Sequence, residues 1–380
     1  MKKIIPLLLA LFLLCACQSE PTPAETTVPV ITTEATEATE PTEETTVPTT
    51  EATEATEETT VPTTEAPQMQ YVHPLTGELL DEPMTTRPVA VVTNNISAAQ
   101  PLMGIGSADV LFEHIAEGGG TITRIVAIYT DLENAGVLGC VRSARTYLID
   151  LARSFNAPIV HCGYSPFAET ELHQTGYPSF NQFVYPQYFY RDQARLNAGY
   201  SSEHTLMIKA TDLMKGLQEN DFDMTVAPDV DYGMQFTEDV KLDGSAANKI
   251  TFRFFNPTGK TTTMTYNEEE GVYYGVQKWE SKQSKIADGN TNESVPFKNV
   301  LILNISVRYA ENQYHVFTTM TGEGTGYFAC NGEYVPIKWH RENPEDPFTY
   351  TLEDGSPVVL GIGKTYIAML PNRSPAVSFE

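Results

Sequence analysis

The sequence has little positive charge, few cysteines and no apolar segment long enough to cross a bilayer. Its 24 Lys and Arg residues stand against 49 Asp and Glu residues, a net charge of −25 over 380 residues. A nucleic-acid-binding role is therefore not expected, because affinity for phosphate comes from clustered Lys and Arg. The five cysteines and seven histidines form no CxxC pair and no HExxH motif, so no metal site is expected. Gly104-Ile105-Gly106 lacks the third glycine of a dinucleotide fingerprint, so no nucleotide cofactor is expected either.

The N-terminus has the pattern of a secretion signal. Lys2 and Lys3 precede an apolar run from Ile4 to Leu14, which is shorter than the roughly 20 residues that span a bilayer. The run ends in the letters LCAC, which resemble the lipobox of bacterial lipoproteins; an ordinary signal peptide with a chance cysteine is the alternative. The resemblance implies a signal peptide over residues 1–16 and acylation of Cys17, with palmitate as one such acyl group. The protein is then held by lipid at the extracytoplasmic face of the cell membrane.

Residues 17–68 form a low-complexity segment of Thr, Glu and Pro. The phrases EATEATE and ETTVPTT each occur twice, and the segment contains no Lys, Arg or aromatic residue. Such a segment buries too little apolar surface to offset the loss of chain entropy on folding. We therefore expect a disordered stalk between the membrane and the folded part. An O-glycosylated stalk is the alternative, and it has the same tethering role.

The remaining sequence predicts an α/β domain over residues 69–230 and a smaller β-rich domain over residues 231–380. Short apolar runs bounded by Gly, Asn or Pro predict strands at 88–92, 109–115, 124–129 and 158–160. Helices are predicted over 143–155, with Ser143 as N-cap, and over 202–218. Beyond residue 236, alternating segments separated by turn residues predict strands at 249–255, 261–266, 272–279, 299–307, 314–319, 327–330 and 364–370.

Several long phrases of this region have a recognisable pattern. RPVAVVTNN, ADVLFEHIAEGGGTITRIVAIY and GVLGCVRSARTYLIDLA lie in its first part, and GYFACNGEYVPIKWHRENPEDPFTYTLEDGSPVVLGIGKTYIAMLP lies in its second. They resemble the YerB-like lipoproteins, a family classed as a domain of unknown function. The resemblance covers about residues 87–371. It implies a lipid-anchored extracytoplasmic protein with an α/β domain and then a β-rich one, and it implies no established reaction.

Glu113 and Glu117 are the candidate catalytic residues. If residues 109–117 are extended, positions 113 and 117 lie on one face of the strand, and both carboxylates point toward one site. Paired carboxylates perform acid/base hydrolysis of glycosidic bonds, which makes a cell-wall glycan hydrolase one alternative function. In the other interpretation each glutamate is the ion-pair partner of an arginine. The sequence leaves open whether any reaction is catalysed.

Arg124, Arg142 and Arg145 are candidate ligand-binding residues. Arg142 and Arg145 flank Ser143 at the predicted start of a helix, where free N–H groups and the helix dipole favour anions. Guanidinium groups bind carboxylate and phosphate well, so an anion site is expected here. The alternative is an intramolecular ion-pair network with Glu113, Glu117 or Asp150.

Two further polar residues are candidates for ligand binding, and three cysteines are considered beside them. Asn94, in the phrase RPVAVVTNN, and His161, directly after a predicted strand, complete the candidate ligand-binding set. Cys162 lies beside His161, but neighbours on a strand point to opposite faces, so His161 is not expected to activate the thiol. At most one disulfide can form among Cys140, Cys162 and Cys330, and the sequence does not say whether any two pair.

Residues 164–200 are rich in aromatic side chains, with ten Tyr and Phe residues interleaved with prolines. Such a segment suits a groove for sugar rings or a peptide; a long connection packed on the sheet by its aromatic residues is the alternative. Taken together, the sequence predicts an envelope lipoprotein that binds its ligand in a Glu/Arg-lined cleft. The alternatives are the glycan hydrolase and a non-enzymatic adaptor for an envelope protein partner.

Overall fold

The computed structural model describes residues 70–117, 122–254, 259–280, 282–312, 314–372 and 376–380. The predicted signal peptide, Cys17 and the stalk over residues 17–68 lie outside these ranges. The described residues belong to one compact unit. In the described ranges, no helix is both long and apolar enough to cross a membrane.

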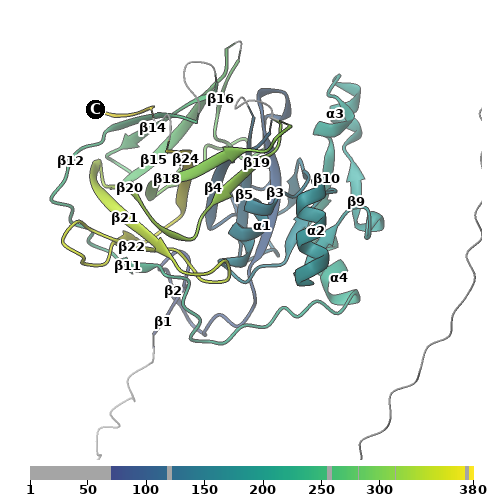
Figure 1. Ribbon diagram of the computed structural model, residues 1–380, viewed down its shortest axis with the longest axis horizontal. Coiled ribbons are helices and arrows are strands. Elements are labelled where there is room, and N and C mark those ends of the chain that lie inside the picture. The colour runs from purple at the N-terminus through teal and green to yellow at the C-terminus, as the bar shows by residue number, and fades with distance from the viewer. Residues whose placement is uncertain (1–69, 118–121, 255–258, 281, 313, 373–375) are drawn as a thin grey trace, which may run out of the picture. The chain divides into compact units, whose positions relative to one another are not determined.

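A sheet of 12 strands organises the described residues (Figure 1). Its strands lie in the order β12 (Ser245–Ala246), β21 (Glu333–Arg341), β20 (Gly322–Cys330), β18 (Asn299–Tyr309), β24 (Thr365–Pro371), β4 (Val110–Ile115), β5 (Thr123–Tyr129), β3 (Val89–Asn95), β7 (Ile159–His161) and β8 (Ser179–Asn181). β19 (Val316–Thr319) pairs with β18, and β22 (Thr349–Thr351) pairs with β21. Strands from both halves of the sequence thus form one sheet.

Most strands at the centre of this sheet run in one direction. β18, β24 and β4 are parallel, and so are β3, β7 and β8. β5 lies antiparallel between β4 and β3, so these six parallel strands share one direction. Their carboxyl ends therefore lie along one edge of the sheet.

Smaller sheets complete the strand content. An antiparallel sheet has the order β16 (Gln283–Lys285), β15 (Val272–Lys278), β14 (Thr261–Asn267), β13 (Lys249–Arg253) and β25 (Ala376–Phe379), with β17 (Pro296–Phe297) on β15. A three-stranded sheet joins β6 (Val137–Gly139), β10 (Leu206–Lys209) and β9 (Phe189–Arg191). Two pairs remain: β1 (Tyr71–Val72) with β2 (Leu79–Leu80), and β11 (Gln235–Thr237) with β23 (Val359–Gly361).

The helices are few and lie within residues 146–219. They are α1 (Thr146–Arg153), α2 (Pro166–Thr175), α3 (Gln193–Asn197) and α4 (Ala210–Glu219), with short 3-10 turns at Ser97–Ala99, Pro186–Tyr188 and Ser202–His204. The described part of the chain is therefore mostly β as a whole, and its α-helices all lie within the region expected to be α/β. After Glu219 the described residues contain no helix, as the turn-rich sequence predicts.

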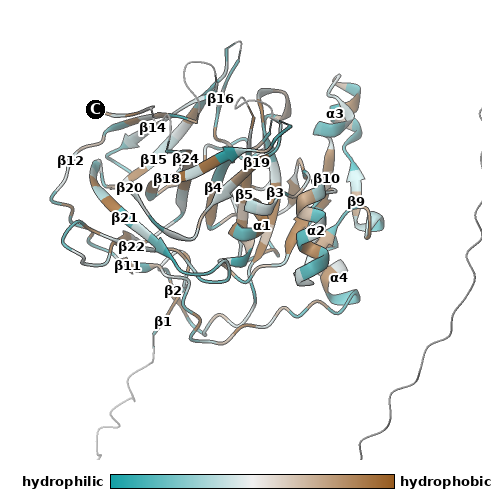
Figure 2. Cartoon of the chain, in the orientation of Figure 1, coloured by the Kyte–Doolittle hydropathy of each residue, from teal (hydrophilic) through white to brown (hydrophobic). Residues whose placement is uncertain are grey.

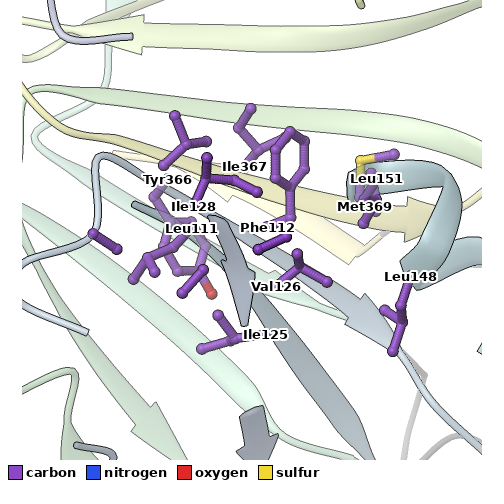
Figure 3. Packing of buried hydrophobic residues seen from close by; sticks show 14 of the residues in the cluster. Leu111, Phe112, Ile125, Val126, Ile128, Leu148, Leu151, Tyr366, Ile367 and Met369 are labelled. Carbon is purple, nitrogen blue, oxygen red and sulfur yellow. The ribbon is translucent and has the colours of Figure 1, made fainter. Parts of the chain in front are cut away.

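Both faces of the central strands are buried. On one face, Phe112 of β4 and Met369 of β24 pack with Leu148 and Leu151 of α1 (Figure 3). On the other face, the ring of Tyr366 of β24 lies 5.2 Å from that of Phe297 in the antiparallel sheet. Strands buried on both faces need near-continuous apolar sequence, and the central strands are accordingly coloured as hydrophobic in Figure 2.

Two predicted helices differ from the observed ones. The helix expected from Ser143 begins at Thr146, with Arg145 as N-cap, because the preceding residues are extended and the Ala144 amide donates to the Gly163 carbonyl. The helix expected over 202–218 is divided. Ser202–His204 is a 3-10 turn, Leu206–Lys209 is the strand β10, which pairs with both β6 and β9, and only Ala210–Glu219 is α-helical.

Candidate functional site

The candidate residues lie around the edge where the parallel strands end. Ligands of open α/β sheets bind beyond the carboxyl ends of the strands. Here Asn94 lies near the end of β3, Glu117 follows β4, and Cys162 follows β7. Arg124 lies at the same edge because it starts the antiparallel strand β5, where it pairs with Asn94 and His114.

Glu113 and Glu117 do not share a site, contrary to the sequence-based expectation. Glu113 is fully buried and contacts Lys260, Tyr366 and the Asn95 amide, whose Nδ2 donates to its Oε1 at 2.8 Å. Glu117 instead forms ion pairs with arginines. The physical reason is that β4 ends at Ile115, so the two-residue alternation of a strand does not continue to position 117.

Glu117 forms a buried ion-pair group with Arg124 and Arg145. Glu117 Oε2 lies 3.4 Å from Arg124 Nη2, and Oε1 contacts Arg145 Nη2. Backbone carbonyls also hold both guanidiniums, since Arg124 donates to Ser143 O at 2.5 Å and Arg145 to Ala144 O at 2.7 Å. Burial lowers the pKa of Arg124 to about 10, which still leaves it charged at neutral pH. Glu117, Arg124 and Arg145 therefore form an intramolecular ion-pair network, which was the alternative to an anion site.

Arg142 lies at the accessible side of this group. Its Nη2 is 3.1 Å from Glu203 Oε2, and the side chains are 24% and 53% exposed. Glu203 follows Ser202 in a 3-10 turn that the sequence analysis assigned to a helix, so this partner was not anticipated. Arg142 is thus a surface cation in a place where the neighbouring cations are buried.

Several buried polar atoms near these arginines have no hydrogen-bond partner within the described residues. They are Nε of Arg124, Arg142 and Arg145, the Tyr147 hydroxyl and Nε2 of His114. The His114 ring stacks on Tyr147 with centroids 4.3 Å apart, and burial lowers the His114 pKa to about 4, so the ring is neutral at physiological pH. His114 Nδ1 donates to Ile115 O, so Nε2 of the neutral ring is an acceptor, whereas each arginine Nε is a donor. Buried polar atoms without a partner are uncommon in folded proteins.

Tyr314, from the second half of the chain, also lies near the arginines. Burial lowers the pKa of Arg145, and the nearby Tyr147 and Tyr314 act in the opposite direction. Tyr314 is 51% exposed and packs edge-on against His315, just before β19. Sequence reasoning missed Tyr314, because no periodicity or motif links it to residues that lie about 170 positions earlier.

Asn94 and His161 have partners within the protein. Asn94 Nδ2 lies 3.0 Å from His204 Nδ1. The His161 ring nitrogens bind Gly163 O at 2.7 Å and Ser179 Oγ at 2.6 Å, and burial lowers its pKa to about 4. Both side chains are therefore engaged within the fold.

The cysteines, the potential metal ligands and one cavity add no further candidate site among the described residues. Cys140, Cys162 and Cys330 are all free thiols, and the described ranges contain no group of three or more potential metal ligands. A cavity of about 420 Å³ lies elsewhere, with Val89, Met214 and Leu217 among its lining residues, and none of the candidate residues lines it.

The protein is mostly β. Two regions of its sequence contribute strands to one mixed sheet, and arginines gather at one edge of that sheet. The chain belongs to the family described as "Protein of unknown function (DUF3048)": its N-terminal domain matches residues 75–223 and its C-terminal domain matches residues 250–367. The family resemblance expected from the sequence is thereby confirmed.

Two relatives are similar to most of the chain. "Putative lipoprotein YerB" of Bacillus subtilis (strain 168) is 26% identical over 305 residues, which are 80% of this chain and 87% of the relative. The crystal structure of YerB protein from Bacillus subtilis matches with a TM-score of 0.69 at 23% identity, covering 81% of this chain and 99% of that one. The second similarity establishes the shared fold.

Substitution of Glu117 tests the buried ion-pair group. Glu117→Gln leaves Arg124 and Arg145 without a carboxylate, and we expect it to lower the free energy of unfolding by about 3 to 5 kcal/mol. Glu203→Gln is the matched control, since its pair with Arg142 is exposed and is expected to contribute less than about 1 kcal/mol. Chemical denaturation of both variants measures the difference, and equal small losses would show that Glu117 is not a buried counterion.

Proposed function

We propose that this protein is a lipoprotein, anchored through Cys17 at the extracytoplasmic face of the membrane, whose folded part binds an anionic ligand of the cell envelope. The anchor proposal rests on the LCAC phrase after a short apolar run and on the lipoprotein name of the Bacillus subtilis relative. Residues 17–68 are then the tether between the lipid and residues 69–380. In this proposal the α/β region is residues 69–230 and the β-rich region is residues 231–380.

The charge balance at the sheet edge is the observation that carries the ligand proposal. Three guanidiniums, from Arg124, Arg142 and Arg145, face two carboxylates, from Glu117 and Glu203. This local excess of positive charge occurs in a chain with a net charge of −25. Each of the three arginines also has an Nε without a partner among the described residues.

The chemistry of these groups favours a carboxylate or phosphate ligand. Guanidinium groups held by other contacts bind such anions with little further loss of side-chain freedom. Glu117 and the backbone carbonyls hold Arg124 and Arg145, whereas Arg142 is accessible. We therefore propose that Arg142 contacts the ligand directly. The buried Arg124 and Arg145 add positive charge behind it.

The alternatives gain less support. A glycan hydrolase needs two carboxylates at one reacting bond, whereas Glu113 and Glu117 have separate cationic partners. An adaptor role for an envelope protein has Tyr314 and Phe167 in its favour, since both side chains are exposed and lie against His315. A peptide carrying an acidic group satisfies both the aromatic residues and the arginines.

The anchor is tested by replacing the acylated cysteine. Cys17→Ala is expected to move the protein from the membrane fraction into the medium, because a single lipid-modified terminus is the proposed attachment. Fractionation followed by immunoblotting measures this. Cys162→Ala, which leaves the N-terminus intact, is the control. Retention of the Cys17→Ala protein in the membrane would contradict the anchor assignment.

The ligand site is tested at Arg142, because that side chain can be changed without stranding a buried charge. We expect Arg142→Gln to raise the Kd for purified cell-wall polymer fragments by roughly 10- to 100-fold, the scale of a lost charge-assisted hydrogen bond. Arg253→Gln on β13 is the control and should bind as wild type does. Equal affinity of wild type and Arg142→Gln for these fragments, measured calorimetrically, would overturn the proposal.

A further inference from the structure

The environment of Glu113 differs from that of the proposed ligand site. Glu113 Oε1 contacts Lys260 Nζ and also accepts a hydrogen bond from Asn95 Nδ2 at 2.8 Å. All three side chains are almost completely buried. One carboxylate oxygen therefore connects an amine and a primary amide that are 165 positions apart in the sequence.

Burial favours the neutral form of the amine, against the two aromatic rings and the carboxylate beside it, which favour the charged form. Lys260 Nζ lies 5.6 Å from the Phe254 ring centroid and 6.0 Å from that of Trp279. Burial lowers the Lys260 pKa, while the Glu113 charge acts in the opposite direction. In a medium of low dielectric constant, moving the proton from the ammonium to Glu113 exchanges a charged pair for a neutral one.

The Asn95 amide is held as an electrophile. Gln100 Nε2 donates to Asn95 Oδ1 at 3.1 Å, and Thr123 Oγ1 accepts from Nδ2 at 3.1 Å. A donor on the carbonyl oxygen polarises the C=O bond and stabilises negative charge that develops there during nucleophilic attack. The leaving nitrogen already lies against the Glu113 carboxyl group.

We infer that Lys260 and Asn95 are placed to form an intramolecular amide bond, with Glu113 as the catalytic residue that transfers the protons. Glu113 takes a proton from Lys260, and the neutral amine attacks Cγ of Asn95. The Nζ–Cγ bond forms, and negative charge on Oδ1 is stabilised by Gln100. Glu113 then delivers this proton to Nδ2 and, as a carboxylate again, accepts the second proton from Nζ; the Cγ–Nδ2 bond breaks, and ammonia departs.

The reaction needs no oxidant, metal or cofactor, because one amide replaces another and ammonia is the sole by-product. Holding nucleophile and electrophile together in a dry site supplies the effective concentration that makes amine attack on an amide accessible. Tyr366 is a positioning residue, since its hydroxyl donates to the second oxygen of Glu113. The product would covalently join the family's N-terminal domain at Asn95 to its C-terminal domain at Lys260.

Peptide mapping of the full-length protein, purified from membranes, reduced and denatured, tests the inference directly. We expect a linked pair of peptides carrying Asn95 and Lys260, lighter by about 17 Da, the mass of ammonia, than the two peptides together. Trypsin should also fail to cleave after Lys260. Recovery of the two peptides separately would overturn the inference, and so would a pair linked from Lys260 to Glu113 through loss of about 18 Da of water.

Variants separate the roles of the three side chains. Lys260→Arg retains a cation beside Glu113 but has no amine that can form the bond, so no linked pair is expected. Glu113→Gln retains the amine and the amide and is expected to slow linkage by about 100-fold or more, the scale of lost acid/base catalysis. Because Glu113→Gln can fail to fold, Tyr366→Phe is a second variant, which keeps the carboxylate and should link more slowly than wild type. A linked pair in Lys260→Arg, or unchanged linkage rates in folded Glu113→Gln or in Tyr366→Phe, would contradict the proposed mechanism.

Discussion

Parallel pairing between β4 and β24 is the contact on which the described structure depends. Residues 110–114 lie beside residues 365–369, so a strand near the end of the chain continues a sheet that begins in its first third. The strands β18, β20 and β21 join that sheet only through β24. Because buried strands of this kind need both faces covered, α1 and the antiparallel sheet are both required to stabilise the pairing.

Glu113 and Glu117 are four residues apart in the sequence, but in the fold they belong to two separate polar groups. On the face toward the antiparallel sheet, Glu113 is enclosed with Lys260, Tyr366 and Asn95. At the end of β4, Glu117 turns toward arginines near the start of α1. The first group is closed to solvent and suits a reaction within the chain. The second group extends to the accessible Arg142 and suits an external anion.

Local patterns in the sequence predicted most of the longer strands, but not the tertiary contacts of the candidate residues. The runs Val89–Val92 and Ile125–Tyr129 are apolar throughout, so their identity depends on neighbours in sequence. The position of Leu206–Lys209 depends instead on pairing with β6 and β9, which overrides its helical spacing. Arg142 and Arg145 were chosen as candidates because guanidiniums near a predicted helix start have a sequence signal. Lys260 and Tyr366 were not, since their link to Glu113 is made by the tertiary fold alone.

If the pairing of β4 with β24 joins the two halves of the chain, both halves should unfold together, and Phe112→Ala tests this. Phe112 is fully buried on β4 and packs edge-on against Phe155, with ring centroids 5.6 Å apart, so its loss should cost about 3 to 5 kcal/mol. The two tryptophans, Trp279 and Trp339, lie in the second half of the chain, whereas the described helices lie before residue 220. In denaturant titrations, tryptophan fluorescence and helical circular dichroism should therefore shift together, while exposed Phe183→Ala leaves both nearly unchanged. A shift in the helical signal with an unchanged tryptophan transition would contradict the account.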